Sequence, residues 1–159
     1  MPSTPLFDFE TIDLSRTVAS RDEIYRLLKQ SGRFAMLDGI LHFDPQGSVV
    51  LGFKEILPGD WWAADHIPGR PIFPGALMIE AAAQLCAWDY MKRAHGSEDV
   101  FVGFGGLEST RFRGLVEPGC RMIFAGAVKR IRSRMFTYAA QAFVDRELVF
   151  ETDVIGVIV

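Results

Sequence analysis

Apolar residues along the chain follow more than one period, and the longest apolar stretch is apolar on almost every side. Residues 75–93 place five alanines among larger apolar side chains, which predicts a slim helix buried all round. Residues 121–131, 135–145 and 148–159 are apolar or alternate between apolar and polar positions, as strands of an antiparallel sheet do. The pattern therefore predicts an α+β fold in which a largely antiparallel sheet wraps one long helix.

Shorter patterns predict the remaining elements. These are a capped helix at residues 21–30, a hairpin formed by 34–41 and 49–53, and two short strands at 100–104 and 108–112. Residues 1–19 form an irregular lead-in. Because no repeat or linker interrupts the chain, we expect residues 1–159 to form a single domain.

Composition narrows the class of protein. The chain has 159 residues, 49% of them hydrophobic and 23% charged, which is ordinary for a globular protein. A net charge of −3 gives no support for nucleic-acid binding. The N-terminus lacks the basic and apolar pattern of a signal peptide, and no apolar stretch is long enough to span a membrane. Two distant cysteines, Cys86 and Cys120, predict neither a disulfide nor a metal site, so we expect a cytoplasmic protein.

The candidate catalytic residues lie within residues 65–84. His66 lies in a proline-rich loop, and Glu80 lies fourteen residues later in the apolar helix. Alone, His66 could be a structural loop histidine and Glu80 a helix charge that reaches solvent. Together, a histidine and a carboxylic acid beside an apolar cavity can perform general acid–base chemistry on a hydrophobic substrate. Gly75 opens the helix, where free N–H groups can stabilise an oxyanion, and Gln84 is one turn after Glu80, where it could orient the carboxyl group.

The run His66-Ile-Pro-Gly-Arg-Pro-Ile-Phe-Pro-Gly-Ala-Leu-Met-Ile-Glu-Ala-Ala-Ala-Gln84 resembles a known signature. It is similar to the G-H-F-P-G-x-P-x-x-P-G-V-L-x-x-E-A-x-A-Q motif of the hotdog-fold (3R)-hydroxyacyl-[acyl-carrier-protein] dehydratases of fatty acid synthesis, the FabZ/FabA-like family. A second segment, residues 106–119, looks like the basic strand and Pro-Gly turn of the same family. Glutamate at position 80, where the dehydratase–isomerase branch has aspartate, favours the FabZ branch.

The resemblance implies a role for each matching residue. His66 would remove the C2 proton of a 3-hydroxyacyl thioester, and Glu80 would protonate the departing C3 hydroxyl group. The N–H of Gly75 would polarise the thioester carbonyl, and Gln84 would hold Glu80. Ile67 and Phe73, together with Gly75 and Gln84, would form the substrate-binding surface.

The resemblance also implies the partners. The substrate would be a fatty acyl thioester on the phosphopantetheine of acyl carrier protein, and no further cofactor or metal would be needed. The site would lie at the interface of a homodimer, which could assemble into a trimer of dimers. Asp65 and Ile67 depart from the family's glycine and phenylalanine at these positions.

Basic residues gather between positions 111 and 134 in an otherwise acidic chain. We expect Arg111, Arg113, Arg132 and Arg134 to form a docking patch for the acidic carrier protein, although a solvated strand face has the same composition. Two other functions remain open. One is another hotdog thioester enzyme, either a thioesterase or a coenzyme A-linked hydratase, and the other is a non-catalytic module that binds acyl chains.

Overall fold

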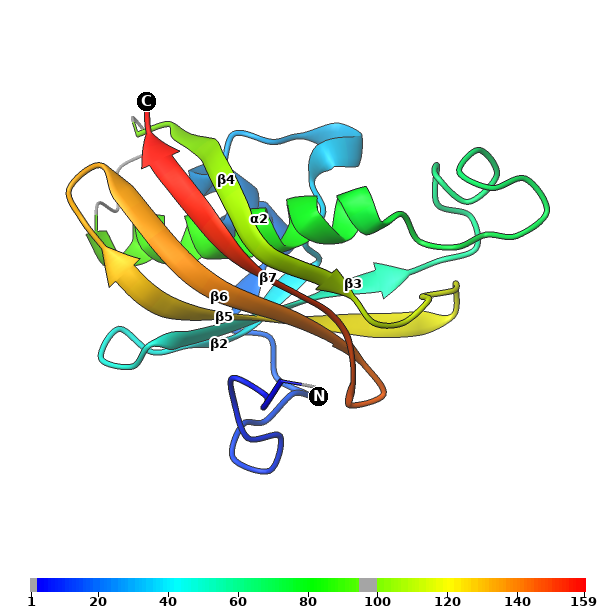
Figure 1. Ribbon diagram of the computed structural model, residues 1–159, viewed down its shortest axis with the longest axis horizontal. Coiled ribbons are helices and arrows are strands. Elements are labelled where there is room, and N and C mark those ends of the chain that lie inside the picture. Colours follow the sequence, from blue (N-terminus) through cyan, green and yellow to red (C-terminus); the bar gives the residue numbers. More distant parts are fainter. Residues whose placement is uncertain (1–2, 95–99) are drawn as a thin grey trace.

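A computed structural model describes residues 3–94 and 100–159 of the chain (Figure 1). Its elements, in chain order, are β1 (Ala19–Ser20), α1 (Arg21–Leu27), the 3-10 turn η1 (Gly32–Phe34), β2 (Gly39–Phe43), β3 (Val49–Ile56), α2 (Gly75–Ala94), β4 (Val102–Phe112), β5 (Cys120–Ile131), β6 (Met135–Val144) and β7 (Glu147–Ile158). The strands form one seven-stranded sheet in the order β1-β2-β3-β5-β6-β7-β4, and every neighbouring pair is antiparallel. The predicted α+β class is confirmed.

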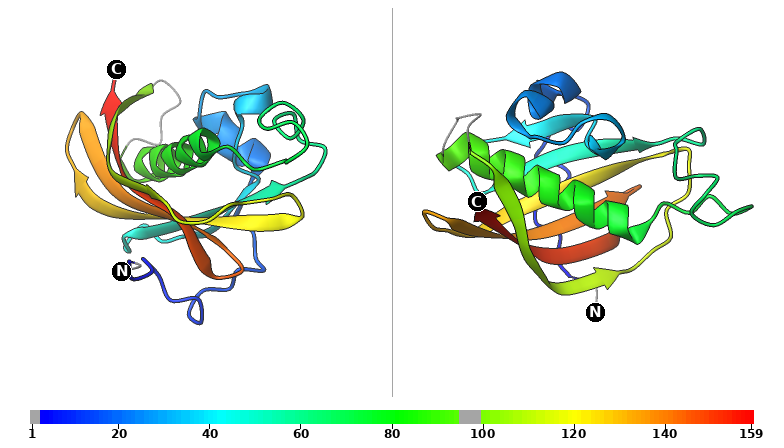
Figure 2. Two further views of the ribbon diagram at one scale, coloured as in Figure 1. Left: turned by 45° about the vertical axis from the view of Figure 1, so that its right-hand side comes forward. Right: turned by 90° about the horizontal axis from the view of Figure 1, so that it is seen from above.

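The sheet curves around α2, which lies along its concave face (Figure 2). Small residues allow the close approach of helix and sheet. A Cβ atom at Gly52 of β3 would lie 3.0 Å from Leu85 Cδ1, and one at Gly126 of β5 would lie 3.4 Å from Cys86 Sγ. Both helix residues are fully buried, so α2 forms the centre of the hydrophobic core, as its sequence predicts.

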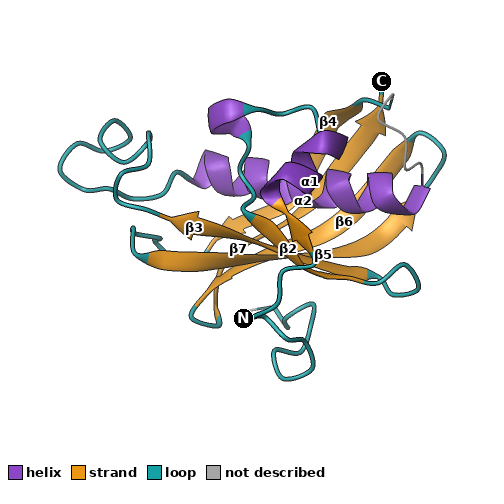
Figure 3. Ribbon diagram, turned by 180° about the vertical axis from the view of Figure 1, so that it is seen from behind, coloured by secondary structure: helices purple, strands orange, loops and turns teal. Residues whose placement is uncertain are grey.

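The N-terminal segment covers the opposite face of the sheet (Figure 3). Phe7 packs there in a second apolar cluster that includes Leu51 of β3 and Phe143 of β6. The side chain of Gln141 fixes the segment by accepting from Leu6 N at 2.9 Å and donating to Thr4 O at 3.0 Å. Residues 3–18 of the lead-in are irregular, as predicted, but they shield apolar sheet surface from water.

The prediction for the edge strand β4 was wrong in one respect. The sequence predicted separate strands at residues 100–104 and 108–112, whereas the structure has one continuous strand from Val102 to Phe112. Its pairing with β7 shifts between Phe104 and Gly106 and again between Glu108 and Arg111. These β-bulges absorb the residues that break the apolar alternation, so pairing continues across them.

The helix before β2, and β2 itself, are shorter than the sequence predicts. Helix α1 ends at Leu27, and Leu28 adopts an extended conformation with ψ 154°, so the predicted helix over 21–30 is too long. Strand β2 begins at Gly39 rather than near residue 34. The intervening residues turn toward α2, where their backbone groups bond to Gln84. None of the described helices is long and apolar enough to cross a membrane.

Candidate active site

His66 lies in the long loop between β3 and α2 and is exposed in the single chain. Its backbone N–H donates to Trp62 O at 2.9 Å, and its ring Nδ1 lies 2.7 Å from Ile72 O. A carbonyl oxygen can only accept, so Nδ1 carries the hydrogen of this bond. The neutral ring then presents the lone pair of Nε2, which is the atom that a general base needs.

The end of the loop is fixed to the core where α2 begins. Phe73 is 1% exposed, packs against Trp62 with ring centroids 5.1 Å apart, and donates its N–H to Val116 O at 2.7 Å. Phe73 therefore supports the loop from inside, while Ile67, the other predicted substrate-binding side chain, is 42% exposed beside His66. At the helix start, a Cβ atom on Gly75 would lie 2.7 Å from Phe112 Cε1, so glycine lets the edge strand pack on the first turn.

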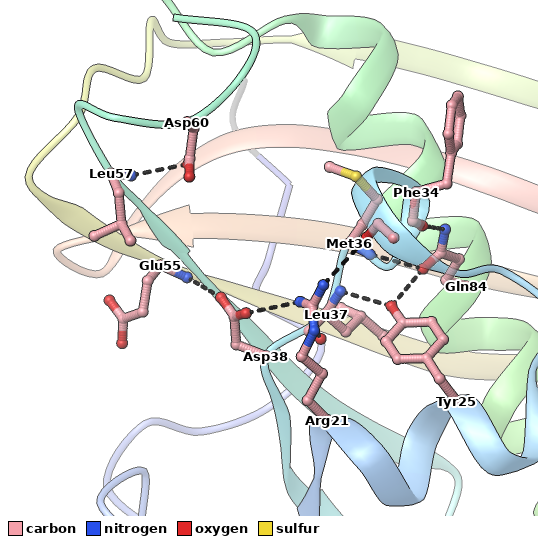
Figure 4. A network of polar contacts seen from close by, with 11 residues as sticks. Arg21, Tyr25, Phe34, Met36, Leu37, Asp38, Glu55, Leu57, Asp60 and Gln84 are labelled. Atoms are coloured by element: carbon pink, nitrogen blue, oxygen red, sulfur yellow. Dashed lines mark hydrogen bonds and ion pairs between the residues drawn. The ribbon is translucent and has the colours of Figure 1, made fainter.

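Glu80 is half-buried on the second turn of α2, and Gln84 holds it as the sequence predicts. The Nε2 of Gln84 donates to Glu80 Oε1 at 2.7 Å. Gln84 is 1% exposed, and its other polar contacts come from the region before β2. Nε2 also donates to Phe34 O at 2.7 Å, while Oε1 accepts from Tyr25 Oη at 2.6 Å and from Met36 N at 3.2 Å (Figure 4).

Glu80 and Gln84 line a cavity of about 210 Å³ between α2 and the strands β4, β6 and β7. Most of its other wall residues are apolar or glycine, namely Ala83, Ala87, Phe101, Val102, Gly103, Phe104, Phe136, Val154, Ile155 and Gly156, and Gln30 adds an amide. A carboxyl group in the wall of a largely apolar cavity is suited to proton transfer on an apolar substrate.

His66 is not part of this cavity. Among the described residues, neither His66 nor Gly75 lines the space that contains Glu80, and no hydrogen bond or ion pair joins His66 to Glu80. The loop that carries His66 projects beyond the first turn of α2 (Figure 1). A single chain thus presents the predicted base and the predicted acid at separate places.

The four arginines of the predicted docking patch fall into two pairs at opposite ends of the sheet. Arg111 is paired with Glu151 in the β4–β7 register, and Arg113 forms an ion pair with the same glutamate. Arg132 and Arg134 belong to the β5–β6 turn, where the carbonyl of Arg134 accepts from Ile158 N at 3.0 Å. Positions 151 and 158 are seven residues apart on β7, which separates the pairs by roughly 23 Å.

Sequence reasoning missed the residues that surround Gln84. Tyr25 was an unremarkable position on the short first helix, and the contributions of Phe34 and Met36 come from their backbone. One usable signal was a tyrosine between the apolar positions of that helix, because a buried tyrosine hydroxyl needs a partner. Among the described residues, no three His, Cys, Asp or Glu side chains converge as a metal site would require.

Residues 28–153 match the FabA-like domain family. This chain belongs to the FabA-like family. Among FabA-like relatives, the 3-hydroxyacyl-[acyl-carrier-protein] dehydratase FabZ of Albidiferax ferrireducens is 33% identical over 137 residues, which cover 82% of this chain and 90% of the relative. The FabZ of Campylobacter jejuni is 34% identical over 140 residues, covering 86% and 95%.

Solved structures share the fold of this FabA-like chain at much lower identity. A chain of the dehydratase heterocomplex ApeI:P from Xenorhabdus doucetiae superposes with a TM-score of 0.73 at 10% identity, covering 91% of this chain and 93% of that one. The PaaI protein of E. coli, from the phenylacetic acid degradation operon, superposes with a TM-score of 0.57 at 11% identity, covering 74% and 80%. At these identities the likeness establishes the fold alone.

Proposed function

We propose that this FabA-like protein is a hydro-lyase of fatty acid biosynthesis that converts (3R)-hydroxyacyl-[acyl-carrier-protein] into the trans-2-enoyl thioester and water. The observation that carries the proposal is the Glu80 carboxyl group, held by Gln84 in the wall of a largely apolar cavity. Relatives that match most of the chain are 3-hydroxyacyl-[acyl-carrier-protein] dehydratases by name, which supports the same reaction.

In the proposed mechanism, His66 Nε2 takes the C2 proton, and the electron pair moves onto the thioester oxygen. The N–H of Gly75 stabilises that developing oxyanion, because the first N–H groups of a helix have no intrahelical acceptor. Glu80 then protonates the C3 hydroxyl group, the C3–O bond breaks, and water leaves as the C2–C3 double bond forms. The cycle closes when His66 loses its proton and Glu80 regains one. This elimination transfers no electrons to a carrier, so we propose that the enzyme uses no cofactor beyond the carrier's phosphopantetheine.

A homodimer would bring the separated base and acid together. β4 is the strand at one edge of the sheet, and Phe101, Phe104 and Phe112 on or beside it are each about half exposed, as expected of a surface that a second copy covers. The Glu80 cavity lies near the start of β4, and Gly75 packs against its end. Antiparallel pairing of two β4 strands would place the helix start and His66 loop of one copy beside the cavity of the other. Such dimers could assemble further into a trimer of dimers.

The proposed partner is acyl carrier protein, in the cytoplasm. We assign its docking to Arg111 and Arg113, which flank the Phe112 ring that packs on Gly75 at the start of α2. Arg132 and Arg134 lie at the far end of the sheet and are not part of this docking proposal. An acidic carrier would be steered to the cationic pair by complementary charge.

The test is the ultraviolet absorbance of enoyl thioester formed from (3R)-hydroxyacyl-carrier-protein. We expect turnover by the unmodified protein and its loss in both His66→Ala and Glu80→Gln. A folded protein that forms no enoyl product across several chain lengths would contradict the proposal. Release of free thiol in the same reactions would then indicate a thioesterase, and binding of acyl chains without turnover would indicate a non-catalytic module.

A further inference from the structure

The hydroxyl group of Tyr25 begins a chain of hydrogen bonds that ends on Glu80. Tyr25 Oη lies 2.6 Å from Gln84 Oε1, and Gln84 Nε2 lies 2.7 Å from Glu80 Oε1. Tyr25 belongs to α1, far from the motif in sequence, and α1 is itself held in place. Its N-terminus has a complete capping box, and Arg21 forms an ion pair of 3.1 Å with Asp38 (Figure 4).

The direction of each hydrogen bond follows from the backbone groups. The N–H of Leu37 can only donate, and it does so to Tyr25 Oη at 2.8 Å. The tyrosine hydrogen is therefore free to point at Gln84 Oε1. Burial raises the pKa of the Tyr25 hydroxyl group well above its ordinary value, so the group keeps this hydrogen at any working pH.

The amide of Gln84 is consequently fixed in one orientation. Its Oε1 accepts from Tyr25 and Met36, and its two Nε2 hydrogens go to Phe34 O and Glu80 Oε1. A flipped amide would set its NH₂ group against the N–H of Met36 and its oxygen against the carbonyl of Phe34, and both pairings are repulsive. Glu80 Oε1 is thus an acceptor, which leaves Oε2 to carry the proton when Glu80 is a neutral acid.

We propose that Tyr25 is a positioning residue for the elimination, acting through Gln84 to hold Glu80 with its transferable proton on Oε2. The inference rests on the proposed function, because it assigns Tyr25 a part in the same proton transfer. Buried hydrogen bonds in a connected chain also polarise one another, so the Tyr25 hydroxyl strengthens the bond that Gln84 donates to Glu80.

The test is Tyr25→Phe, which removes one oxygen and keeps the ring. We expect kcat to fall about three- to tenfold, the worth of one buried hydrogen bond felt in the transition state, with KM changed less than about twofold. In a Gln84→Ala background the same substitution should cause no further loss, because Tyr25 acts through that amide. A kcat equal to that of the unmodified protein, or an equal and independent loss in both backgrounds, would overturn the inference.

Tyr138→Phe is the matched control. Tyr138 is also buried, and its hydroxyl group donates to a carboxylate on α2, Asp89 Oδ2 at 2.6 Å, away from Gln84. We expect Tyr138→Phe to keep kcat within about twofold even if it lowers the melting temperature. A fall in kcat as large as that of Tyr25→Phe would mean that general loosening explains both, and would overturn the inference.

A readout that needs no turnover separates this inference from the proposed function. The side-chain amide signals of Gln84 in a ¹⁵N–¹H spectrum can be assigned by their loss in Gln84→Ala. We expect them to shift in Tyr25→Phe and in Glu80→Gln but not in Tyr138→Phe. If the unmodified protein forms no enoyl product, the proposed function fails even where these shifts occur. If Tyr25→Phe leaves the Gln84 signals in place, the positioning inference fails, whatever the reaction catalysed.

Discussion

Among the glycines that the structure describes, Gly156 of β7 is the one where an added Cβ atom would make the shortest contact. A Cβ atom there would lie 2.0 Å from Phe136 Cζ and 2.4 Å from Cε1 and Cε2 of the same ring. Carbon atoms in contact prefer about 3.5–4.0 Å, so the ring would have to move by about 1.5 Å or more. Phe136 is 1% exposed, with the rings of Tyr90 and Tyr138 at 4.6 and 5.3 Å between centroids, so it cannot move without displacing them.

The cost of Gly156→Ala follows from that geometry. Overpacking a core typically costs about 1–3 kcal/mol, and because this contact is so short we expect a cost of about 3 kcal/mol. For a domain of this size such a loss lowers the melting temperature by about 6–12 °C. Thermal unfolding followed by circular dichroism measures it. Gly59→Ala is the control, because a Cβ atom there would meet nothing within 4 Å, and we expect no measurable shift.

A second substitution tests whether the contact between the new methyl group and the Phe136 ring causes the loss of melting temperature. Phe136→Leu removes the far ring atoms that the new methyl group would meet, so the double variant should melt above Gly156→Ala alone. A Gly156→Ala protein that melts within about 2 °C of the unmodified protein would contradict the expected cost of the clash with Phe136. It would mean that the sheet between β6 and β7 yields more readily than its packing implies.

Three further predictions concern charge and thiols. Arg111→Glu should raise the KM for carrier-linked substrate severalfold and leave the KM for a short thioester analogue unchanged. Arg134→Glu should change neither KM. Equal effects of Arg111→Glu on both substrates would contradict docking at Arg111. The pKa of Glu151 is lowered because hydrogen bonds from Ser3 and Arg113 outweigh the opposing effect of burial. The stabilisation from Glu151 should thus be complete above its ordinary pKa of 4.5 and be lost as the pH falls through the lowered pKa. Glu151→Gln should lower the melting temperature at pH 7, and this loss should shrink as the pH falls below 4.5. A loss of the same size at every pH would contradict the prediction. Burial raises the pKa of the Cys86 thiol, so a disulfide reagent at pH 8 should modify Cys86 only after unfolding. The half-buried Cys120 should react slowly in the native protein. Rapid modification of both thiols in the native protein would contradict the burial of Cys86.

A sheet that wraps one helix was predictable because residues 75–93 are apolar on almost every side and must therefore be covered. Apart from one short helix at residues 21–30, the other predicted elements were strands that could cover it. The continuity of β4 was not predictable in the same way. Gly105, Gly106 and Ser109 interrupt the alternation of side chains, and only the pairing with β7 reveals that bulges carry the strand across these positions.

The contact between Glu80 and Gln84 was predictable from spacing, and the other partners of Gln84 were not. Gln84 follows Glu80 by one helical turn, so their contact is local. Tyr25, Phe34 and Met36 reach Gln84 only because the chain turns between α1 and β2, a path fixed by tertiary packing. The separation of the four arginines into two pairs was not predictable either, because residues close in sequence lie here at the two ends of long antiparallel strands.

We propose that His66 and Glu80 perform one elimination at a site that two copies complete. To test this, His66→Ala and Glu80→Gln protein are mixed in equal amounts, after reversible dissociation to allow exchange of subunits. Random exchange makes about half of the dimers mixed, and each mixed dimer has one site with both groups intact, so about a quarter of the unmodified activity should return. A mixture as inactive as its two components, with mixed dimers present, would contradict a shared site and place both residues' roles within one chain or outside the reaction.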